Sequence, residues 1–522
     1  MLKRMFWFCC LLFWCAHMAF SSTIALVPLD SRPANTYSPQ MIGSMAGFKV
    51  IMPNSLDYFK RPGDCEATAN WLLETDADCY IVSISQLCYG SLISSRISDV
   101  SIDKALERLQ TLRRLRERNP QKPIYVFDTI QRLAITTTDS YSARYYSAVH
   151  NWAILKDEVE NLGRLNKKEE LEALELQIPY EIIEDYLKAR ERNHTINKVL
   201  IDMLHEGVID YLVLAQDDAS LTGLHRAERE VLRDKIIDLG LGNKATIFPG
   251  ADEVGVTLVS RFICSFLDMQ PTLTVTYRGI DGNKWVAPLE DITFAENIRR
   301  HVEAAGGRLA PVGEIKFYVA TPGGDSEAFT NLIQEELNTG KKVVVCDVAN
   351  INRAEPELFR ALLSNIEIKN LTGFAGWNTA GNTLGLALGQ GIASIAREKL
   401  SGEEKQLAEE AHFAYLLSRL AKDYYYKTLL RGSMESWASS RGYDPHNLPL
   451  DSLTQVEKYL QERMQPYLNR LYVNYFSGQV VGNSYLPKEI SWQVHLVWPR
   501  FFEIAIEPEI QLADPILGLE NN

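Results

Sequence analysis

Short apolar runs recur along the chain, and most of them end in a cluster of polar residues. Runs of this kind, without strict alternation, are typical of parallel strands that are buried on both faces of a sheet. We therefore predict one series of strands at 24–28, 48–52, 80–85, 123–127, 210–215 and 245–248, and a second series at 272–277, 315–319, 342–346 and 371–375.

Between these runs lie segments with a helical spacing of apolar residues. Segment 102–118 is an example, because Leu106, Leu109, Leu112 and Leu115 recur at nearly that period. Alternating strands and helices predict an α/β fold with mainly parallel sheets and flanking helices. Segment 141–206 is rich in Glu, Lys, Leu and Ala, and we expect two or three helices that lie over the sheet or cap its edge.

A chain of 522 residues is too long for one simple core. The two series of strands predict two α/β lobes, at 22–265 and 266–400. A helical region, 401–522, follows and ends in a β segment at about 490–508. The alternative is that all strands close into a single (β/α) barrel-like unit.

The polar clusters matter because the carboxyl ends of parallel strands converge on one edge of a sheet, where ligands bind. Asp30 and Arg32 follow the first strand, and Asp128 and Arg132 follow the fourth. Each pair can orient a ligand by charge-assisted hydrogen bonds. The alternative for Asp30 and Arg32 is an internal ion pair that fixes their loop.

Asp217 and Asp218 form the sharpest motif, because two adjacent carboxylates follow a buried strand. Like charges in close proximity raise one pKa, which keeps a carboxyl group protonated as a general acid. Adjacent side chains of an extended segment point in opposite directions. One of the two would therefore face the cleft, while the other holds a backbone group or an arginine.

Asp252 and Glu253 form a second acidic pair after the sixth strand. Glu253 near a helix N-terminus would be stabilised as an anion, which favours a base or nucleophile. Asp252 can instead cap that helix, as we expect of Asp139 and Asp325 for the helices that follow them.

A glycine-rich loop, 376–383, carries an indole, two amides and hydroxyl groups. Trp377, Asn378 and Asn382 suit a sugar, since an aromatic face stacks on C–H groups while amides bind hydroxyl groups. The alternative is that Trp377 fills an interior gap and the asparagines satisfy backbone groups. Asp347 offers one more carboxylate at the end of a strand.

The first 21 residues have the features of a secretory signal. Lys3 and Arg4 precede an apolar stretch that is too short to span a bilayer comfortably, and small residues follow it. The sequence thus predicts a secreted or extracytoplasmic protein without a stable membrane span after cleavage; the alternative is a retained N-terminal anchor. The net charge of −13 becomes more negative without the signal, which argues against nucleic acid as a partner.

Five cysteines remain after the signal, and none forms a CxxC motif. Cys79, Cys264 and Cys346 lie in apolar runs and are expected to be buried thiols. A bridge from Cys65 to Cys79 or Cys88 is the alternative.

Several chemistries have no support in the sequence. There is no GxSxG or HExxH motif, and the strand-end clusters contain no histidine. We predict no cofactor and no metal site, although the oxygen ligands present can hold Mg²⁺ or Ca²⁺.

Taken jointly, five segments resemble a bacterial family that is known as a domain of unknown function and numbered 4127. They span nearly the whole chain after the signal, and they are 28–33 (Pro-Leu-Asp-Ser-Arg-Pro), 216–218 (Gln-Asp-Asp), 249–253 (Pro-Gly-Ala-Asp-Glu), 376–382 (Gly-Trp-Asn-Thr-Ala-Gly-Asn) and 498–500 (Trp-Pro-Arg). The resemblance implies one family unit and brings no activity with it.

The preferred hypothesis is a secreted hydrolase that cleaves a carbohydrate, as glycosidases do, with two carboxyl groups. The acid would be Asp217 or Asp218, and the base or nucleophile would be Asp128, Asp252 or Glu253. Alternatives are a non-catalytic solute-binding protein and an Mg²⁺- or Ca²⁺-dependent hydrolase. The expected partner is a small molecule or saccharide, and the sequence leaves the oligomeric state open.

Overall fold

The first of two parallel sheets confirms the six strands expected in the N-terminal half. A computed structural model describes residues 22–482 and 484–513, so the predicted signal at 1–21 lies outside the described residues. The six strands run in the order β2-β1-β3-β4-β5-β6 and are all parallel. They are β1 (Thr23–Val27), β2 (Lys49–Ile51), β3 (Cys79–Ser83), β4 (Ile124–Ile130), β5 (Tyr211–Gln216) and β6 (Ala245–Pro249).

The second sheet is also parallel and has five strands in the order β11-β10-β9-β7-β8. They are β7 (Thr272–Arg278), β8 (Arg308–Leu309), β9 (Ile315–Ala320), β10 (Lys342–Asp347) and β11 (Gly373–Ala375). The sequence does not predict β8, because this two-residue strand is exposed and has no apolar run. The α/β fold is confirmed, and the single barrel is wrong because the described strands form separate open sheets.

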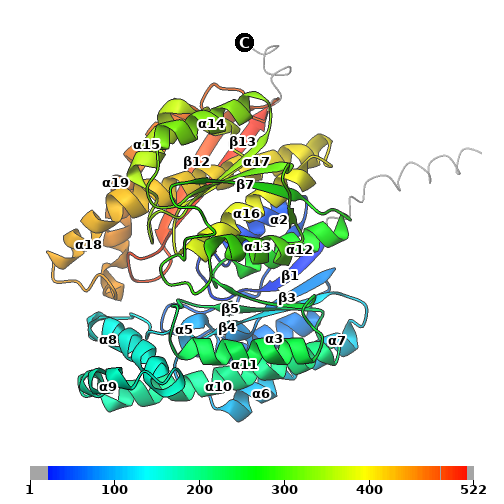
Figure 1. The fold of residues 1–522 in the computed structure, drawn as a ribbon. Coiled ribbons are helices and arrows are strands. Elements are labelled where there is room, and N and C mark those ends of the chain that lie inside the picture. The colour runs from blue at the N-terminus through cyan, green and yellow to red at the C-terminus, as the bar shows by residue number, and fades with distance from the viewer. Residues whose placement is uncertain (1–21, 483, 514–522) are drawn as a thin grey trace, which may run out of the picture.

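A layer of helices lies between the two sheets (Figure 1) and consists of α2 (Tyr37–Met45), α12 (Val254–Phe266), α13 (Phe294–Ala304) and α16 (Ala380–Arg397). One hydrophobic core joins this layer to both sheets: Ile24 of β1, Val256 of α12, Leu388 of α16 and Val344 of β10 belong to it. Solvent therefore does not separate the two sheets. Both sheets pack against the same layer of helices and stabilise it.

Glycines let α12 and α16 approach closely. A Cβ atom at Gly385 would lie 2.2 Å from Cγ of Glu253, and one at Gly389 would lie 2.4 Å from a methyl group of Val256. This face of α16 thus admits no larger side chain without movement of α12.

The outer face of the first sheet is covered by helices, among them α3 (Cys65–Glu74), α6 (Ile102–Leu109), α7 (Thr111–Arg118) and α10 (Tyr180–His205). The helix expected at 102–118 is split at Gln110. Of its four leucines, Leu109, Leu112 and Leu115 are buried and Leu106 is partly buried.

The insertion is helical as expected and contains α8 (Ser140–Lys156), α9 (Lys168–Glu175) and α10. The carboxylate of Asp139 accepts a hydrogen bond from the backbone N–H of Ser142 at the start of α8, and Asp325 similarly caps α14 (Ser326–Asn338), so both predicted caps are confirmed. Asp252 makes no such cap at α12.

The C-terminal region covers the outer face of the second sheet, beside α14 and α15 (Pro356–Asn365). It contains α17 (Gly402–Leu420), a π-helical segment η4 (Ala421–Leu430), α18 (Arg431–Ser439) and α19 (Leu453–Tyr475). The expected β segment is an antiparallel ribbon of β12 (Leu486–Leu496) and β13 (Ile504–Ala513).

The five cysteines of the described residues are buried and free, which confirms the thiol interpretation and removes the bridge from Cys65. Within 22–482 and 484–513, no helix is both long and apolar enough to cross a membrane.

Candidate functional site

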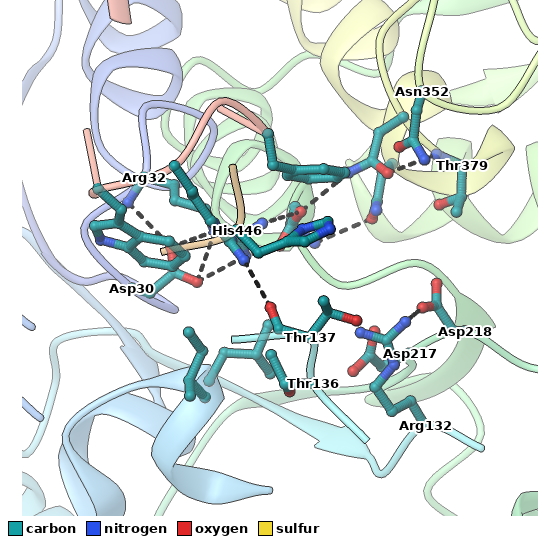
Figure 2. Close-up of a pocket in the computed structure, with 18 of the residues that line it drawn as sticks. Asp30, Arg32, Arg132, Thr136, Thr137, Asp217, Asp218, Asn352, Thr379 and His446 are labelled. Carbon is teal, nitrogen blue, oxygen red and sulfur yellow. Dashed lines mark hydrogen bonds and ion pairs between the residues drawn. The ribbon is translucent and has the colours of Figure 1, made fainter. Parts of the chain in front are cut away.

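A cavity of about 290 Å³ lies at the carboxyl ends of strands from both sheets (Figure 2). Loops after β1, β4, β5, β6, β10 and β11 contribute to its wall. It brings together eight of the twelve predicted site residues, which are Asp30, Arg32, Arg132, Asp217, Asp218, Asp252, Asn378 and Asn382.

Arg32 bridges two carboxylates of the cavity wall. Its guanidinium donates to Asp30 at 2.6–3.0 Å and to Asp252 at 2.5 and 2.9 Å. The internal ion pair that the alternative interpretation proposed for Asp30 and Arg32 therefore exists, and Arg32 also ties the loop after β1 to the loop after β6. Burial raises the pKa of Asp252 and the negative charge of Asp30 adds to this effect, whereas Arg32 opposes it.

A further buried carboxyl group lies behind Asp30. Asp57 accepts a hydrogen bond from the backbone N–H of Ser31 at 2.8 Å. Burial, with the charge of Asp30, raises the pKa of Asp57 to about 8, so this group is largely protonated at neutral pH. The protonated Asp57 limits the negative charge that collects around Arg32.

The two predicted asparagines position Asp252 and its backbone. Asn378 Nδ2 donates to the Asp252 carboxylate at 3.1 Å. Asn382 Oδ1 accepts from the backbone N–H groups of Ala251 and Asp252 at 2.8 and 3.1 Å. These contacts join the loop after β11 in the second sheet to the loop after β6 in the first.

Asp217 and Asp218 both line the cavity, so the expectation that only one faces it is wrong. Each is held by an arginine: Asp217 pairs with Arg96, and Asp218 pairs with Arg132. A turn at Asp218, where φ is +31°, breaks the alternation of an extended segment.

The pKa of Asp217 also differs from the prediction. Burial alone would raise it, but the positive charges of Arg96 and Arg132 bring it below its ordinary value. These arginines therefore favour the ionised form of Asp217, which is not the protonated acid expected of this pair.

Arg96 lies in a loop that the helical insertion holds in place. Arg192 of α10 donates to the carbonyl oxygens of Ser95, Ile97 and Val100 at 2.5–3.0 Å. The neighbouring loop after β4 supplies the hydroxyl-bearing residues Thr136 and Thr137 to the cavity. Tyr146 of α8 also lines it, and its hydroxyl oxygen accepts a hydrogen bond from Arg132 at 3.3 Å.

Four predicted residues do not line the cavity, and each is buried elsewhere. Asp128 lies within β4 and accepts a hydrogen bond from Asn197 at 2.8 Å, and burial raises its pKa to about 7. Glu253 accepts from the backbone N–H of Ala251 at 2.8 Å, and its other oxygen lies 3.0 Å from Nε2 of His301.

The other two are Asp347 and Trp377. Asp347 accepts from the backbone N–H of Glu355 at 2.6 Å and that of Ala349 at 3.2 Å, so it organises the loop after β10. Trp377 is fully buried beside Lys427, whose Nζ lies 5.2 Å from the centre of the indole ring. Trp377 thus fills the interior, as the alternative interpretation of its loop proposed.

Trp498 is the tryptophan that lines the cavity, although it is only 1% exposed. It follows β12, lines the cavity, and donates from Nε1 to the hydroxyl oxygen of Ser31 at 2.9 Å. Sequence reasoning missed this and several other lining residues that lie outside the strand ends; they are Arg96, Tyr146, Arg431, Glu435, His446, Trp498, Arg500 and Phe502. The Trp-Pro-Arg motif at 498–500 was a usable signal.

The described residues contain no group of three His, Cys, Asp or Glu side chains that is placed to hold a metal ion. The cavity is instead lined by carboxylates, amides, hydroxyl groups, guanidinium groups and an indole. These groups can bind a small polar ligand and can exchange protons with it.

Over the described residues, fold and site define an α/β protein with two open parallel sheets and a polar cavity at their carboxyl edges. The chain belongs to the family described as Protein of unknown function (DUF4127), which it matches over residues 24–507. Neither the curated proteins nor the solved structures gave a match.

Proposed function

We propose that this protein is a hydrolase of carbohydrates in which Asp252 is the general acid and Asp217 the base or nucleophile. The observation that carries this proposal is that both carboxyl groups line one cavity while their surroundings shift their pKa values in opposite directions. Divergent pKa values in one site are typical of an acid and base pair. The roles are the reverse of those that the sequence favoured.

The rest of the cavity supports a saccharide. Tyr146 and Phe502 are partly exposed aromatic side chains of the lining, and Asn352, Asn378 and Thr379 offer amide and hydroxyl groups for sugar hydroxyls. A volume of about 290 Å³ suits one or two sugar units. Export remains part of the proposal through the predicted signal at 1–21, and cell fractionation tests it.

The test is a screen of oligosaccharides and aryl glycosides, followed by variants of the two acids. Asp217→Asn and Asp252→Asn should each lower turnover by about 10²- to 10⁴-fold. Asp157→Asn is the matched control, because Asp157 is a buried aspartate paired with Arg226 and lies away from the cavity. Unchanged turnover in both cavity variants would contradict the proposal, and assays with EDTA and with added Mg²⁺ or Ca²⁺ test the metal-dependent alternative.

A second candidate is a solute-binding protein. It is favoured by the ion pairs that hold Asp30, Asp217, Asp218 and Asp252, since such pairs preorganise a site for binding. Tight binding of a saccharide that is recovered unchanged after long incubation would support this role over hydrolysis.

A further inference from the structure

One guanidinium of the cavity wall has no counter-ion among the described residues. Arg500 lies in the loop between β12 and β13 and lines the cavity. Its Nη1 donates to the carbonyl oxygen of Thr137 at 3.4 Å, and its Nε has no hydrogen-bond partner among the described residues. Within the described part of the chain, Arg500 forms no ion pair.

The other cavity arginines differ from Arg500, because each has a carboxylate partner. The pairs are Arg32 with Asp30 and Asp252, Arg96 with Asp217, Arg132 with Asp218, and Arg431 with Glu435. An arginine without an acid is therefore an exception in this site.

The two acids that interact electrostatically with Arg500, Asp30 and Glu503, already have other partners. Asp30 accepts hydrogen bonds from Arg32 and Asn35, and Glu503 pairs with Lys422 and Lys427. Neither carboxylate can move to Arg500 without leaving another buried polar group unsatisfied.

Aromatic rings surround the Arg500 guanidinium. Its Cζ lies 4.7 Å from the ring centre of Trp498, 5.2 Å from that of Phe59 and 5.4 Å from that of Phe502. Cation–π contacts offset part of the lost hydration, but they supply no negative charge. Such walls also keep water away, which strengthens any ion pair formed there.

We propose that Arg500 binds an anionic substituent of the saccharide, either the carboxylate of a uronic acid or a sulfate or phosphate ester. Guanidinium groups bind such anions through two parallel hydrogen bonds. The substrate class is therefore an acidic carbohydrate; the saccharide part of this inference rests on the proposed function.

The electrostatics of the wall support the same assignment. Burial lowers the pKa of Arg500 to about 9, and the positive charges of Arg32 and Arg96 add to this, while Asp30 and Glu503 oppose it. An anion in the cavity would relieve the repulsion between these guanidinium groups.

The test compares charged and neutral saccharides by calorimetry and tryptophan fluorescence with the full chain after the signal. The probes are glucuronate and galacturonate, glucose 6-sulfate and glucose 6-phosphate, each against the neutral parent sugar. We expect at least about tenfold tighter binding of a charged member. Comparison among the charged probes also shows whether the site prefers a carboxylate, a sulfate or a phosphate group.

Arg500→Gln should abolish the preference for charge, and Arg500→Lys should restore part of it. Arg441→Gln is the matched control, because Arg441 lies over the ring of Trp437, at 4.2 Å from its centre, and does not line the cavity. In the wild type, inorganic sulfate should protect Arg500 from phenylglyoxal, as read by mass spectrometry, and this measurement needs no variant.

Equal binding of charged and neutral members, binding of none of them, or an unchanged preference in Arg500→Gln would overturn the inference. The proposed function would survive any of these results if the protein hydrolysed neutral glycans and Asp217→Asn abolished that activity. Acidic saccharides that bind through Arg500 and are never cleaved would instead support the inference and contradict the hydrolase.

Discussion

At the scale of single residues, the buried carboxylates of the cavity depend on the arginines beside them. The side chains of Arg96 and Asp217 are 8% and 10% exposed. Arg96→Met would leave Asp217 unpaired, which should lower the free energy of unfolding by about 3–5 kcal/mol. Urea denaturation measures this, and the double variant Arg96→Met/Asp217→Asn should recover much of the loss.

A control for this prediction is Arg233→Met, because the pair of Arg233 with Asp234 is exposed. Exposed pairs contribute about 0–1 kcal/mol. If Arg96→Met were as mild as Arg233→Met, Asp217 would not depend on its arginine.

Asp128 makes a prediction about pH. Its pKa is raised to about 7 by burial, so the folded protein keeps a proton there that the unfolded chain loses above about pH 4. The stability that this proton provides is present below about pH 4 and is lost as the pH rises to about 7. The free energy of unfolding of Asp128→Asn should therefore rise relative to that of the wild type when the pH is raised from 4.5 to 8. The expected relative gain is on the order of 2–4 kcal/mol.

Urea denaturation at the two pH values checks this difference. Asp139→Asn is the control. Desolvation raises the pKa of Asp139, but hydrogen bonds from Lys60 and Ser142 outweigh this effect and hold the pKa at about 2. A carboxylate that stays ionised over this range should show no such gain, and an equal gain in both variants would contradict the assignment to Asp128.

At the scale of elements, the sequence predicted all ten strands that have an apolar run, because burial on both faces requires such runs. It missed β8, whose two exposed residues carry no pattern. Caps were predictable where an aspartate precedes a helix, as at Asp139 and Asp325. Asp252 has the same local context, but its distant partner Arg32 decides its role.

The contact between α12 and α16 makes a prediction at this scale. Gly385→Ala would place a methyl group 2.2 Å from the Glu253 side chain, and we expect a loss of about 1–3 kcal/mol despite the better helix propensity of alanine. Gly432→Ala in α18 is the matched control, because a Cβ atom there meets nothing within 4 Å and should be neutral or stabilising by up to about 1 kcal/mol. Thermal or urea unfolding compares the two, and equal effects would contradict close packing.

At the scale of the whole molecule, the sequence predicted that strand ends share one cavity but not which C-terminal residues complete it. Strand ends converge for a geometric reason that applies to any parallel sheet. Trp498 and Arg500 reach the cavity only because the β12–β13 ribbon and α17 to α19 fold back over the second sheet. Such long-range packing has no local pattern, which is why the sequence did not place segment 498–500 in the site.

This arrangement predicts that the C-terminal region and the sheets unfold together. Phe374 of β11 is fully buried in a core that also contains Leu417 of α17 and Ile506 of β13. Phe374→Ala should lower the free energy of unfolding by about 3–5 kcal/mol. Because Trp498 donates a hydrogen bond to Ser31 in the loop after β1, its fluorescence reports the contact between that loop and the C-terminal region.

The difference between spectra of the wild type and Trp498→Phe isolates that signal from the other tryptophans. We expect its midpoint to coincide with that of far-UV circular dichroism, and both midpoints to shift equally in Phe374→Ala. If the Trp498 signal moved alone, the C-terminal region would be an independent unit. The cavity would then open without unfolding of the sheets, whereas a common midpoint means that an intact cavity requires the whole fold.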